Sequence, residues 1–336
     1  MDNNNKKVIF AENKNYKKII YRLISCGMLL GIFVQSANAD SYRYKKDKTT
    51  AYISVGQANV KANELVYCQP LSGCPVDHKL SQLIWDINNV AVLAVGLKVS
   101  FDKISTMNIE GKMGLVDGEG VMDDYDWQYF ALDWSDWSHH EDTILSDLTS
   151  LDVNMDFNLY GDKKSKLSFL VGYRKETWAW ESRGGTYIYS TIPTDYRDLS
   201  GTFTPGQLGI SYEQQFTMPY LGFKFETILN KWKFNIQYDY SNQVEVSATD
   251  HHHLRNLIFI DNFEKGTMSA YKVGIGYQIT KSFDVYLRYD VQEYDEVRGN
   301  TMYVNSNTGA IVGACVNCAG ADNSNQTLFI GTTFVY

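Results

Sequence analysis

The chain has 336 residues, of which 44% are hydrophobic and 14% aromatic, and its 31 basic and 39 acidic residues give a formal net charge of −8. This apolar content excludes a disordered chain, the absence of any run of about 18 apolar residues excludes a bundle of membrane helices, and the negative charge argues against a nucleic-acid partner. The 24 tyrosines, 16 phenylalanines and 7 tryptophans favour strands, whose half-buried surfaces accommodate aromatic side chains.

Residues 1–39 have the pattern of a secretory signal peptide. Basic residues precede the apolar run Leu23 to Val34, and small residues follow at Ala37-Asn38-Ala39. We therefore expect cleavage after Ala39, which leaves 40–336 as a single exported domain. A short membrane anchor is the alternative, but an apolar run of twelve residues is too short to span a bilayer. The exported part would carry 25 basic and 37 acidic residues, so its field attracts cations, including basic peptides.

Four cysteines remain after that cleavage, in two closely spaced pairs. An exported compartment permits disulfides, and the short spacings favour two bonds that staple loops, Cys68–Cys74 and Cys315–Cys318. A zinc site built from all four thiolates is the alternative, which an oxidising compartment disfavours.

Alternation of apolar and polar residues predicts strands along the whole exported part. The clearest pattern lies at 150–160, where apolar residues alternate with Asp152, Asn154 and Asp156. Ten such segments can be placed, at approximately 50–68, 79–101, 105–115, 143–160, 166–190, 208–229, 232–247, 268–280, 283–297 and 325–336. Tight turns alternate with long loops, and the long loops are expected at 69–78, 116–142, 191–207, 248–267 and 298–324.

This arrangement predicts an all-β fold, a ten-stranded antiparallel up-and-down transmembrane β-barrel with long extracellular loops. An even strand number, short turns at one end and charged residues on the polar faces are typical of bacterial outer-membrane barrels. A soluble closed barrel is the alternative, because a period of two alone does not say which face meets the core. Ten strands enclose a narrow lumen filled by side chains, which argues against a general diffusion pore.

Two constellations in the predicted loops contain residues suited to acid–base chemistry. In an extended segment, Asp124 and Asp126 point the same way, and neighbouring carboxylates raise each other's proton affinity. A solvated acidic loop is the alternative. The same spacing places Asp250 beside His252, where a carboxylate fixes the imidazole tautomer and produces a base able to activate water. Metal binding by the histidine run and a chance surface cluster are the alternatives there.

Several motifs, in the same order along the chain, resemble the signature of the omptin family. They are Trp134 to Thr143, Gly172-Tyr173 followed by Arg183 to Tyr187, Met218-Pro219-Tyr220 and the carboxyl-terminal strand. The resemblance covers residues 50–336. Omptins are ten-stranded outer-membrane barrels that act as surface endopeptidases and cut beside or between basic residues. The resemblance therefore implies a bacterial outer-membrane endopeptidase whose active site faces the extracellular side and whose substrates are peptides or proteins with Lys or Arg.

On this resemblance, the family's catalytic aspartate pair falls on Asp124 and Asp126, and its Asp–His dyad falls on Asp250 and His252. The implied mechanism is of the aspartic type: a water between the pair and the dyad attacks the peptide bond, with no covalent intermediate, no cofactor and no metal. Three alternatives stay open on the sequence. They are a serine protease using Ser138 and His140, a non-catalytic outer-membrane adhesin, and a narrow pore.

The resemblance also implies residues that select the substrate. Glu64 matches the acidic residue that receives the basic side chain before the cut, and Asp136 matches one that attracts a basic residue after it. Many omptins carry a second acidic residue just upstream of the dyad, where this chain has Ala248. This departure predicts weaker or broader selection before the scissile bond.

Lipid is the other partner that the resemblance implies. Omptins bind lipopolysaccharide through the barrel wall, and Tyr173 of that site is kept, whereas Thr177 and Gln215 stand where the family has arginines. Lys175 and Arg174 are nearby substitutes. The expected lipid partners are therefore the bulk outer-membrane lipid, which surrounds the barrel, and lipopolysaccharide, a candidate activator whose binding site is only partly kept.

Overall fold

A computed structural model describes residues 48–336 apart from 70–73, 76, 130–131 and 163. The predicted signal peptide at 1–39 lies outside the described residues. Within the described part nearly every residue belongs to an antiparallel strand, and no helix there is long and apolar enough to cross a membrane.

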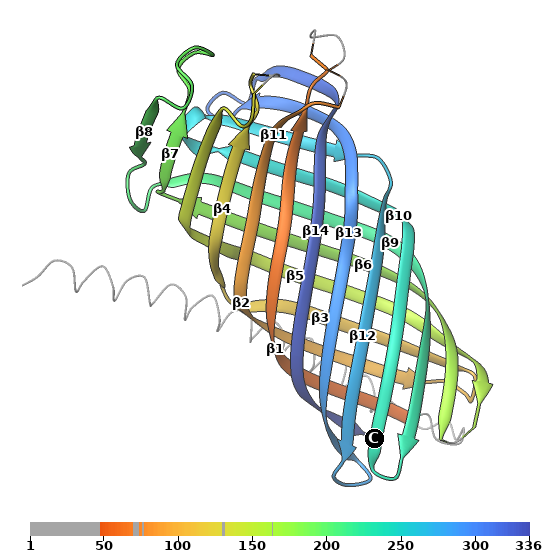
Figure 1. The fold of residues 1–336 in the computed structure, drawn as a ribbon. Coiled ribbons are helices and arrows are strands. Elements are labelled where there is room, and N and C mark those ends of the chain that lie inside the picture. Colours follow the sequence, from red (N-terminus) through yellow and green to blue (C-terminus); the bar gives the residue numbers. More distant parts are fainter. Residues whose placement is uncertain (1–47, 70–73, 76, 130–131, 163) are drawn as a thin grey trace, which may run out of the picture.

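The described strands close into a barrel whose wall consists of ten strands (Figure 1). Eight of the ten are uninterrupted: β1 (Lys48–Tyr67), β2 (Lys79–Ser100), β5 (Asp136–Gly161), β6 (Ser165–Arg183), β9 (Leu208–Leu229), β10 (Trp232–His252), β13 (Phe283–Asn305) and β14 (Ile311–Val335). The other two are interrupted: β3 (Ser105–Val116) is continued by β4 (Glu119–Asp126), and β11 (Leu257–Phe263) is continued by β12 (Gly266–Gln278). Pairing of β1 with β14 and of β3 with β5 closes the ring, which confirms the predicted ten-stranded barrel.

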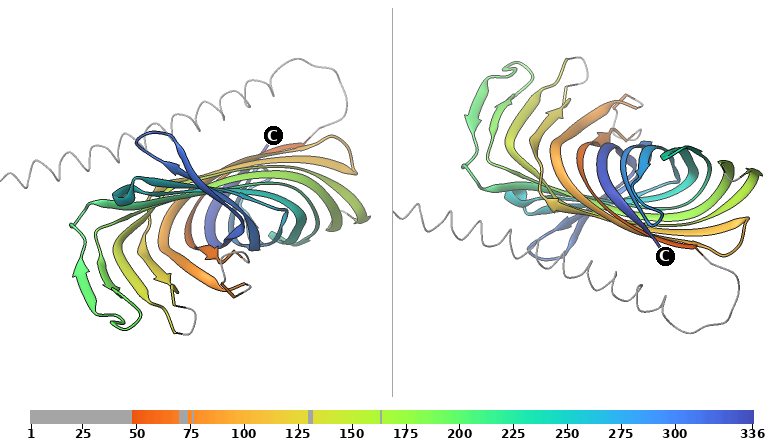
Figure 2. Two further views of the ribbon diagram at one scale, coloured as in Figure 1. Left: turned by 90° about the horizontal axis from the view of Figure 1, so that it is seen from above. Right: turned by 90° about the horizontal axis from the view of Figure 1, so that it is seen from below.

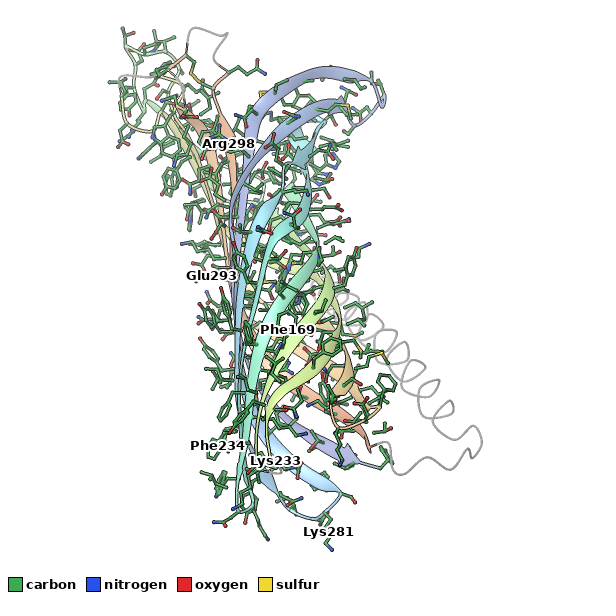
Figure 3. The ribbon with its side chains drawn as sticks, turned by 90° about the vertical axis from the view of Figure 1, so that its right-hand side faces the viewer. Phe169, Lys233, Phe234, Lys281, Glu293 and Arg298 are labelled. Atoms are coloured by element: carbon green, nitrogen blue, oxygen red, sulfur yellow. A yellow bond between two sulfur atoms is a disulfide. The ribbon has the colours of Figure 1, made fainter. Side chains whose placement is uncertain are left out.

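A short hairpin extends the barrel at the end that carries the long connections. Strands β7 (Thr186–Tyr189) and β8 (Leu199–Thr202) pair with each other, and β7 pairs with the start of β5. Figure 2 shows this hairpin standing away from the barrel wall. Figure 3 places Lys281 in a short turn at one end of the barrel and Arg298 toward the opposite end.

The strands run further than their sequence pattern predicts. Strands β4 and β5 enter the predicted loop 116–142, β10 and β11 enter 248–267, and β13 and β14 enter 298–324. In these extensions both faces of the wall lie beyond the apolar band, so polar residues occupy both faces and the alternation that marks a membrane strand fades. The candidate catalytic residues, predicted in loops, therefore lie on strand ends.

The outer face of the barrel carries an apolar band. Along β12, Tyr271, Val273 and Ile275 point outward and are 49%, 49% and 37% exposed, whereas the intervening Lys272 points inward and lies 3.4 Å from Asp152. This is the apolar-out, polar-in pattern of a membrane barrel. The soluble barrel considered as an alternative is therefore wrong.

Charged and aromatic side chains cross the lumen below the mouth, and a cavity of about 400 Å³ lined by residues such as Glu110, Lys224 and Arg288 remains beneath them. Arg174 lies 2.7 Å from Asp152 and 2.8 Å from Asp239, and the three residues are at most 3% exposed. Above this charged layer, the rings of Trp85, Trp180 and Tyr212 pack together with centroids 5.6 to 6.2 Å apart. The lumen is thus occupied, as predicted for ten strands, and the aromatic layer forms a floor under the barrel mouth.

Candidate active site

The two predicted catalytic pairs lie at the same end of the barrel, on strands that are far apart in the sequence. Asp124 and Asp126 lie on β4, and Asp250 and His252 lie at the end of β10 (Figure 1). In each pair the two residues are two positions apart on a strand, so their side chains share a face. The prediction that each pair shares a face agrees with this placement.

Asp250 and His252 form a buried acid–base pair. Oδ2 of Asp250 lies 2.6 Å from Nε2 of His252, and Asp250 is 1% exposed. Nδ1 of the imidazole faces the guanidinium of Arg255 at 3.3 Å, and the ring of Phe259 packs edge-on at 5.2 Å. Because Nε2 faces the carboxylate and an arginine can only donate, the lone pair of Nδ1 points toward Arg255, and Nδ1 can take a proton where a water molecule replaces this long contact.

Asp124 and Asp126 form a pair of carboxyls that hold protons unusually well. Burial raises the pKa of Asp124, and the carboxylates of Asp126 and Asp250 raise it further. Burial also raises the pKa of Asp126, against the hydrogen bond from Ser81 and the charge of Arg255. The hydroxyl of Ser81 lies 3.4 Å from Oδ1 of Asp124. Such a pair can retain a proton at a pH where separate aspartates have lost theirs.

The pair and the dyad act on each other across the barrel mouth. The carboxylate of Asp250 raises the pKa of Asp124, and His252 lowers that of Asp126. The guanidinium of Arg255 lowers the pKa of both aspartates of the pair. Two stretches of chain more than a hundred residues apart therefore supply one electrostatic unit.

Glu64 joins this unit from β1. It is 4% exposed, and its Oε2 has no hydrogen-bond partner in the described part of the chain. Burial raises its pKa, and the carboxylates of Asp250, Asp261 and Asp124 raise it further. The structure thus brings the predicted substrate-binding acid next to both predicted catalytic pairs.

Asp136 lies on the other side of the aspartate pair. It is opposite Asp126 in the β4–β5 ladder and is 7% exposed. The backbone N–H of Ser190 donates a hydrogen bond to its Oδ1 at 3.0 Å, and the hydroxyl of Ser135 donates to its Oδ2 at 2.7 Å. These bonds hold the carboxylate beside the pair.

The Ser138–His140 pair considered as an alternative catalyst is enclosed. Its hydroxyl and imidazole Nε2 lie 2.9 Å apart, but both residues are 3% exposed. The second ring nitrogen contacts the carbonyl oxygen of Gly184, and Phe203 stacks on the ring at 5.2 Å. A backbone carbonyl, and not a carboxylate, therefore orients this imidazole, and burial lowers its pKa.

The candidate lipid site divides between the outside and the inside of the barrel. Tyr173 is 53% exposed on the outer wall, and Thr177 pairs with Gln215 across β6 and β9. Lys175 and Gln215 line one outer pocket. Arg174 does not belong to this surface, because alternation along β6 turns it into the lumen; the expectation that it substitutes there is wrong.

The cysteines form the two predicted disulfides. Cys68 is bonded to Cys74 after β1, and Cys315 is bonded to Cys318 within β14. The alternative of a four-cysteine zinc site is therefore wrong. In the part of the chain that the structure describes, no group of three or more His, Cys, Asp or Glu side chains is arranged to hold a metal ion.

Four residues around the site escaped the sequence reasoning. Ser81 and Arg255 contact the catalytic pairs, as given above. Tyr189 of β7 lies near the aspartate pair, and burial together with the charges of both aspartates raises the pKa of its hydroxyl. Asp261 of β11 faces Asp250 and Glu64. Ser81, Tyr189 and Asp261 lie on different strands from the groups they face, so no local spacing in the sequence indicates them. Arg255 lies in the short 3-10 helix His253–Arg255, three residues after His252.

Comparisons with known proteins show the family and agree with the fold. The model of the omptin family matches residues 45–336. The plasminogen activator of Yersinia pestis is 30% identical over 313 residues, which covers 91% of this chain and 96% of that protein. The outer membrane protease IcsP of Shigella flexneri is 26% identical and covers 91% of this chain and 96% of its own length.

A solved structure shows the same architecture. The crystal structure of the outer membrane protease OmpT from Escherichia coli superposes with a TM-score of 0.82 at 26% identity, covering 88% of this chain and 99% of that one. The chain therefore belongs to the omptin family, and it is a protease of the bacterial outer membrane.

Proposed function

We propose that this protease is an aspartic-type endopeptidase in which Asp124, Asp126, Asp250 and His252 activate a water molecule. The observation that carries the proposal is that β4 and the end of β10 bring the two pairs together at one end of the barrel, where Asp250 and His252 act on the charges of the aspartate pair. A carboxyl pair able to keep a proton, next to an imidazole held by a carboxylate, is a sufficient set for general acid–base hydrolysis.

In the proposed reaction, the aspartate pair and the dyad hold the water between them. Nδ1 of His252 takes one proton from the water while its oxygen bonds to the scissile carbonyl carbon. Asp250 stabilises the resulting imidazolium at 2.6 Å. The carbon–nitrogen bond then breaks, and the departing amine receives the proton that Asp124 and Asp126 hold. The imidazolium returns its proton to the carboxyl pair, so the reaction needs no covalent intermediate and no cofactor.

Substrate selection follows from charge. The buried carboxyl of Glu64 is proposed to receive a Lys or Arg side chain before the scissile bond, where charge-assisted hydrogen bonds are strong. Asp136 is proposed to attract a basic residue after it. The fixed carboxylate of Asp136 has acceptor capacity left, since each of its oxygens accepts one hydrogen bond in the structure. Lipopolysaccharide remains a proposed activator at the outer wall near Tyr173.

The test compares matched neighbours. Refolded protein with lipopolysaccharide is incubated with a peptide library, next to His252→Ala and Asp124→Asn. His251→Ala and Asp123→Asn are the controls, because these residues point to the opposite face; Asp123 contacts His139 at 2.8 Å there. We expect the site variants to lose cleavage and the controls to keep it. Equal cleavage by the site variants, or no cleavage by the wild type, would contradict the proposal and favour a non-catalytic binding barrel.

A further inference from the structure

Asp261 stands next to Ala248 in the wall of the barrel mouth. The two residues face each other directly in the β10–β11 ladder, and they are 3% exposed each. Ala248 is two positions before Asp250, so its methyl group shares a face with that carboxylate. Asp261 therefore points into the mouth beside the dyad, next to the smallest side chain of that row.

The surroundings of the Asp261 carboxyl do little to stabilise its charged form. The hydroxyl of Thr301 donates a hydrogen bond to its Oδ1. No ion pair of Asp261 with a cation occurs among the described residues. Burial and the carboxylate of Asp250 raise its pKa to about 7, even though the bond from Thr301 opposes this. A buried carboxylate without a cation costs free energy, and such costs are concentrated at functional sites.

Asp261 and Glu64 face the same space. The carboxylate of Asp261 raises the pKa of Glu64, and both carboxylates raise the pKa of the Tyr212 hydroxyl, so that ring lies within reach of both. Oε2 of Glu64 is buried and has no hydrogen-bond partner in the described part of the chain. Two carboxyls, one of them with a buried oxygen that has no hydrogen-bond partner, thus lie around one position, and among the described residues neither carboxyl forms an ion pair with a cation.

The floor of this position is polar and closed. The side chain of Gln214 is fully buried and donates hydrogen bonds at 3.1 Å to the hydroxyl of Tyr212 and to the carbonyl oxygen of Asp322. The amide of Asn323 donates to Gln214 at 3.0 Å. With its own groups satisfied in this way, the floor leaves Oε2 of Glu64 without a partner and Asp261 with only the hydrogen bond from Thr301.

We propose that Asp261 and Glu64 together form the pocket for the basic side chain before the scissile bond, so that Asp261 is a specificity-determining residue. This inference rests on the proposed function. A guanidinium has donors on two edges and can hydrogen-bond both carboxylates at once. The expectation drawn from Ala248, that selection is weak or broad, is then reversed: the second acid is supplied by the neighbouring strand.

The experiment measures a ratio within each enzyme. Two peptides are compared that differ only before the scissile bond, where one has arginine and the other the neutral isostere citrulline. In Asp261→Asn we expect kcat/KM for the arginine peptide to fall about tenfold or more, as for a lost hydrogen bond to a charged group, and kcat/KM for the citrulline peptide to stay within about twofold. Partial misfolding lowers both rates together and leaves the ratio unchanged.

Two further variants separate charge from structure. Thr301→Val removes the hydrogen bond but keeps the carboxylate, so its ratio should stay close to that of the wild type. The double variant Ala248→Asp/Asp261→Asn returns an acid to the facing position, and we expect it to recover most of the arginine preference. If Asp261→Asn keeps the wild-type ratio, or if Thr301→Val lowers the ratio as much as Asp261→Asn does, Asp261 has only a structural role and the inference is wrong.

A binding measurement keeps this inference separate from the catalytic proposal. Calorimetry on His252→Ala compares the affinities for the arginine and citrulline peptides, before and after Asp261→Asn is added. We expect the arginine peptide to lose about tenfold in affinity. That loss supports the pocket even if His252→Ala still cleaves and the mechanism fails. An unchanged affinity refutes the pocket even if the mechanism holds.

Discussion

Buried carboxyls occur in two regions of this barrel, and only one region supplies cations to match them. In the lumen, Asp152 and Asp239 share the guanidinium of Arg174, and Glu110 and Arg288 form another pair at 2.5 Å. At the mouth, the carboxyls gather around a single imidazole and one exposed guanidinium; they are Glu64, Asp124, Asp126, Asp250 and Asp261.

The difference separates structural charge from functional charge. Removing one member of a buried ion pair leaves an uncompensated charge and destabilises the fold. A cluster of like charges does the opposite: it destabilises the fold by being present, and it persists where a substrate or a reaction uses it. Substitutions in the lumen should therefore change stability, and substitutions at the mouth should change activity.

The largest effect is expected from the carboxylate of the dyad. Asp250→Asn keeps the size of the side chain but removes the acceptor that holds Nε2 of His252 and the charge that stabilises the imidazolium. We expect kcat to fall by about 10³-fold or more, by analogy with the buried aspartate of catalytic triads. Steady-state kinetics on one basic peptide measures it, with gel mobility of unheated samples as the check on folding. A loss below about tenfold would contradict the role of the dyad.

The matching substitution in the lumen should act on stability. Arg174→Met leaves the buried Asp152 and Asp239 with only the ammonium of Lys272, at 3.4 and 3.9 Å, and we expect a loss of about 3 kcal/mol in the free energy of unfolding. Denaturant titration in detergent micelles measures it. Adding Asp239→Asn should recover part of the loss. The rate per folded molecule should stay within about threefold, and a catalytic loss as large as that of Asp250→Asn would break the distinction between the two regions.

Asp261→Asn should make the barrel more stable at alkaline pH. Because the folded pKa of Asp261 is raised to about 7, the folded state binds more protons than the unfolded state between the ordinary aspartate pKa and 7. Stability of the wild type therefore falls as the pH rises through this window. The groups that face this carboxyl are Glu64, Asp250, Tyr212 and Tyr303.

At pH 8 we expect the free energy of unfolding of the variant to exceed that of the wild type by about 4 kcal/mol, since the pKa of Asp261 is raised from the ordinary aspartate value to about 7 and each pKa unit corresponds to about 1.4 kcal/mol. Below about pH 4 the difference should vanish, because the wild-type carboxyl is then protonated in both states. Thermal unfolding of both proteins across this range tests the sign. A variant that is less stable than the wild type at pH 8 would identify Asp261 as a structural acid.

The smallest effect is expected from Ser81. Its hydroxyl lowers the pKa of Asp124 and Asp126, so Ser81→Ala should raise both. We expect about a fivefold loss of kcat/KM, as for one hydrogen bond of about 1 kcal/mol. The alkaline limb of the rate profile should move to higher pH, because the pair then keeps its proton longer. An unchanged profile would show that this limb belongs to another group.

The sequence was sufficient for the barrel and for placing the two members of each candidate pair on one face, because both depend on a local period of two; the catalytic role of the pairs came from the family resemblance and stays a prediction. Asp124 with Asp126, and Asp250 with His252, are each set by spacing alone. The sequence does not show which residues of neighbouring strands lie opposite each other. The pairing of Ala248 with Asp261 and of Ser81 with Asp126 depends on the register between neighbouring strands, and β11 begins inside a segment whose polar residues read as a loop.

The central claim is that the pair and the dyad act on one water molecule, and a double-mutant cycle tests it most directly. The rates of Asp126→Asn, His252→Ala and the double variant are compared with the wild type on one basic peptide. If both groups serve the same step, the double variant should be about as slow as the slower single variant. Losses that multiply in full would show that Asp126 and His252 act independently, which would contradict the account.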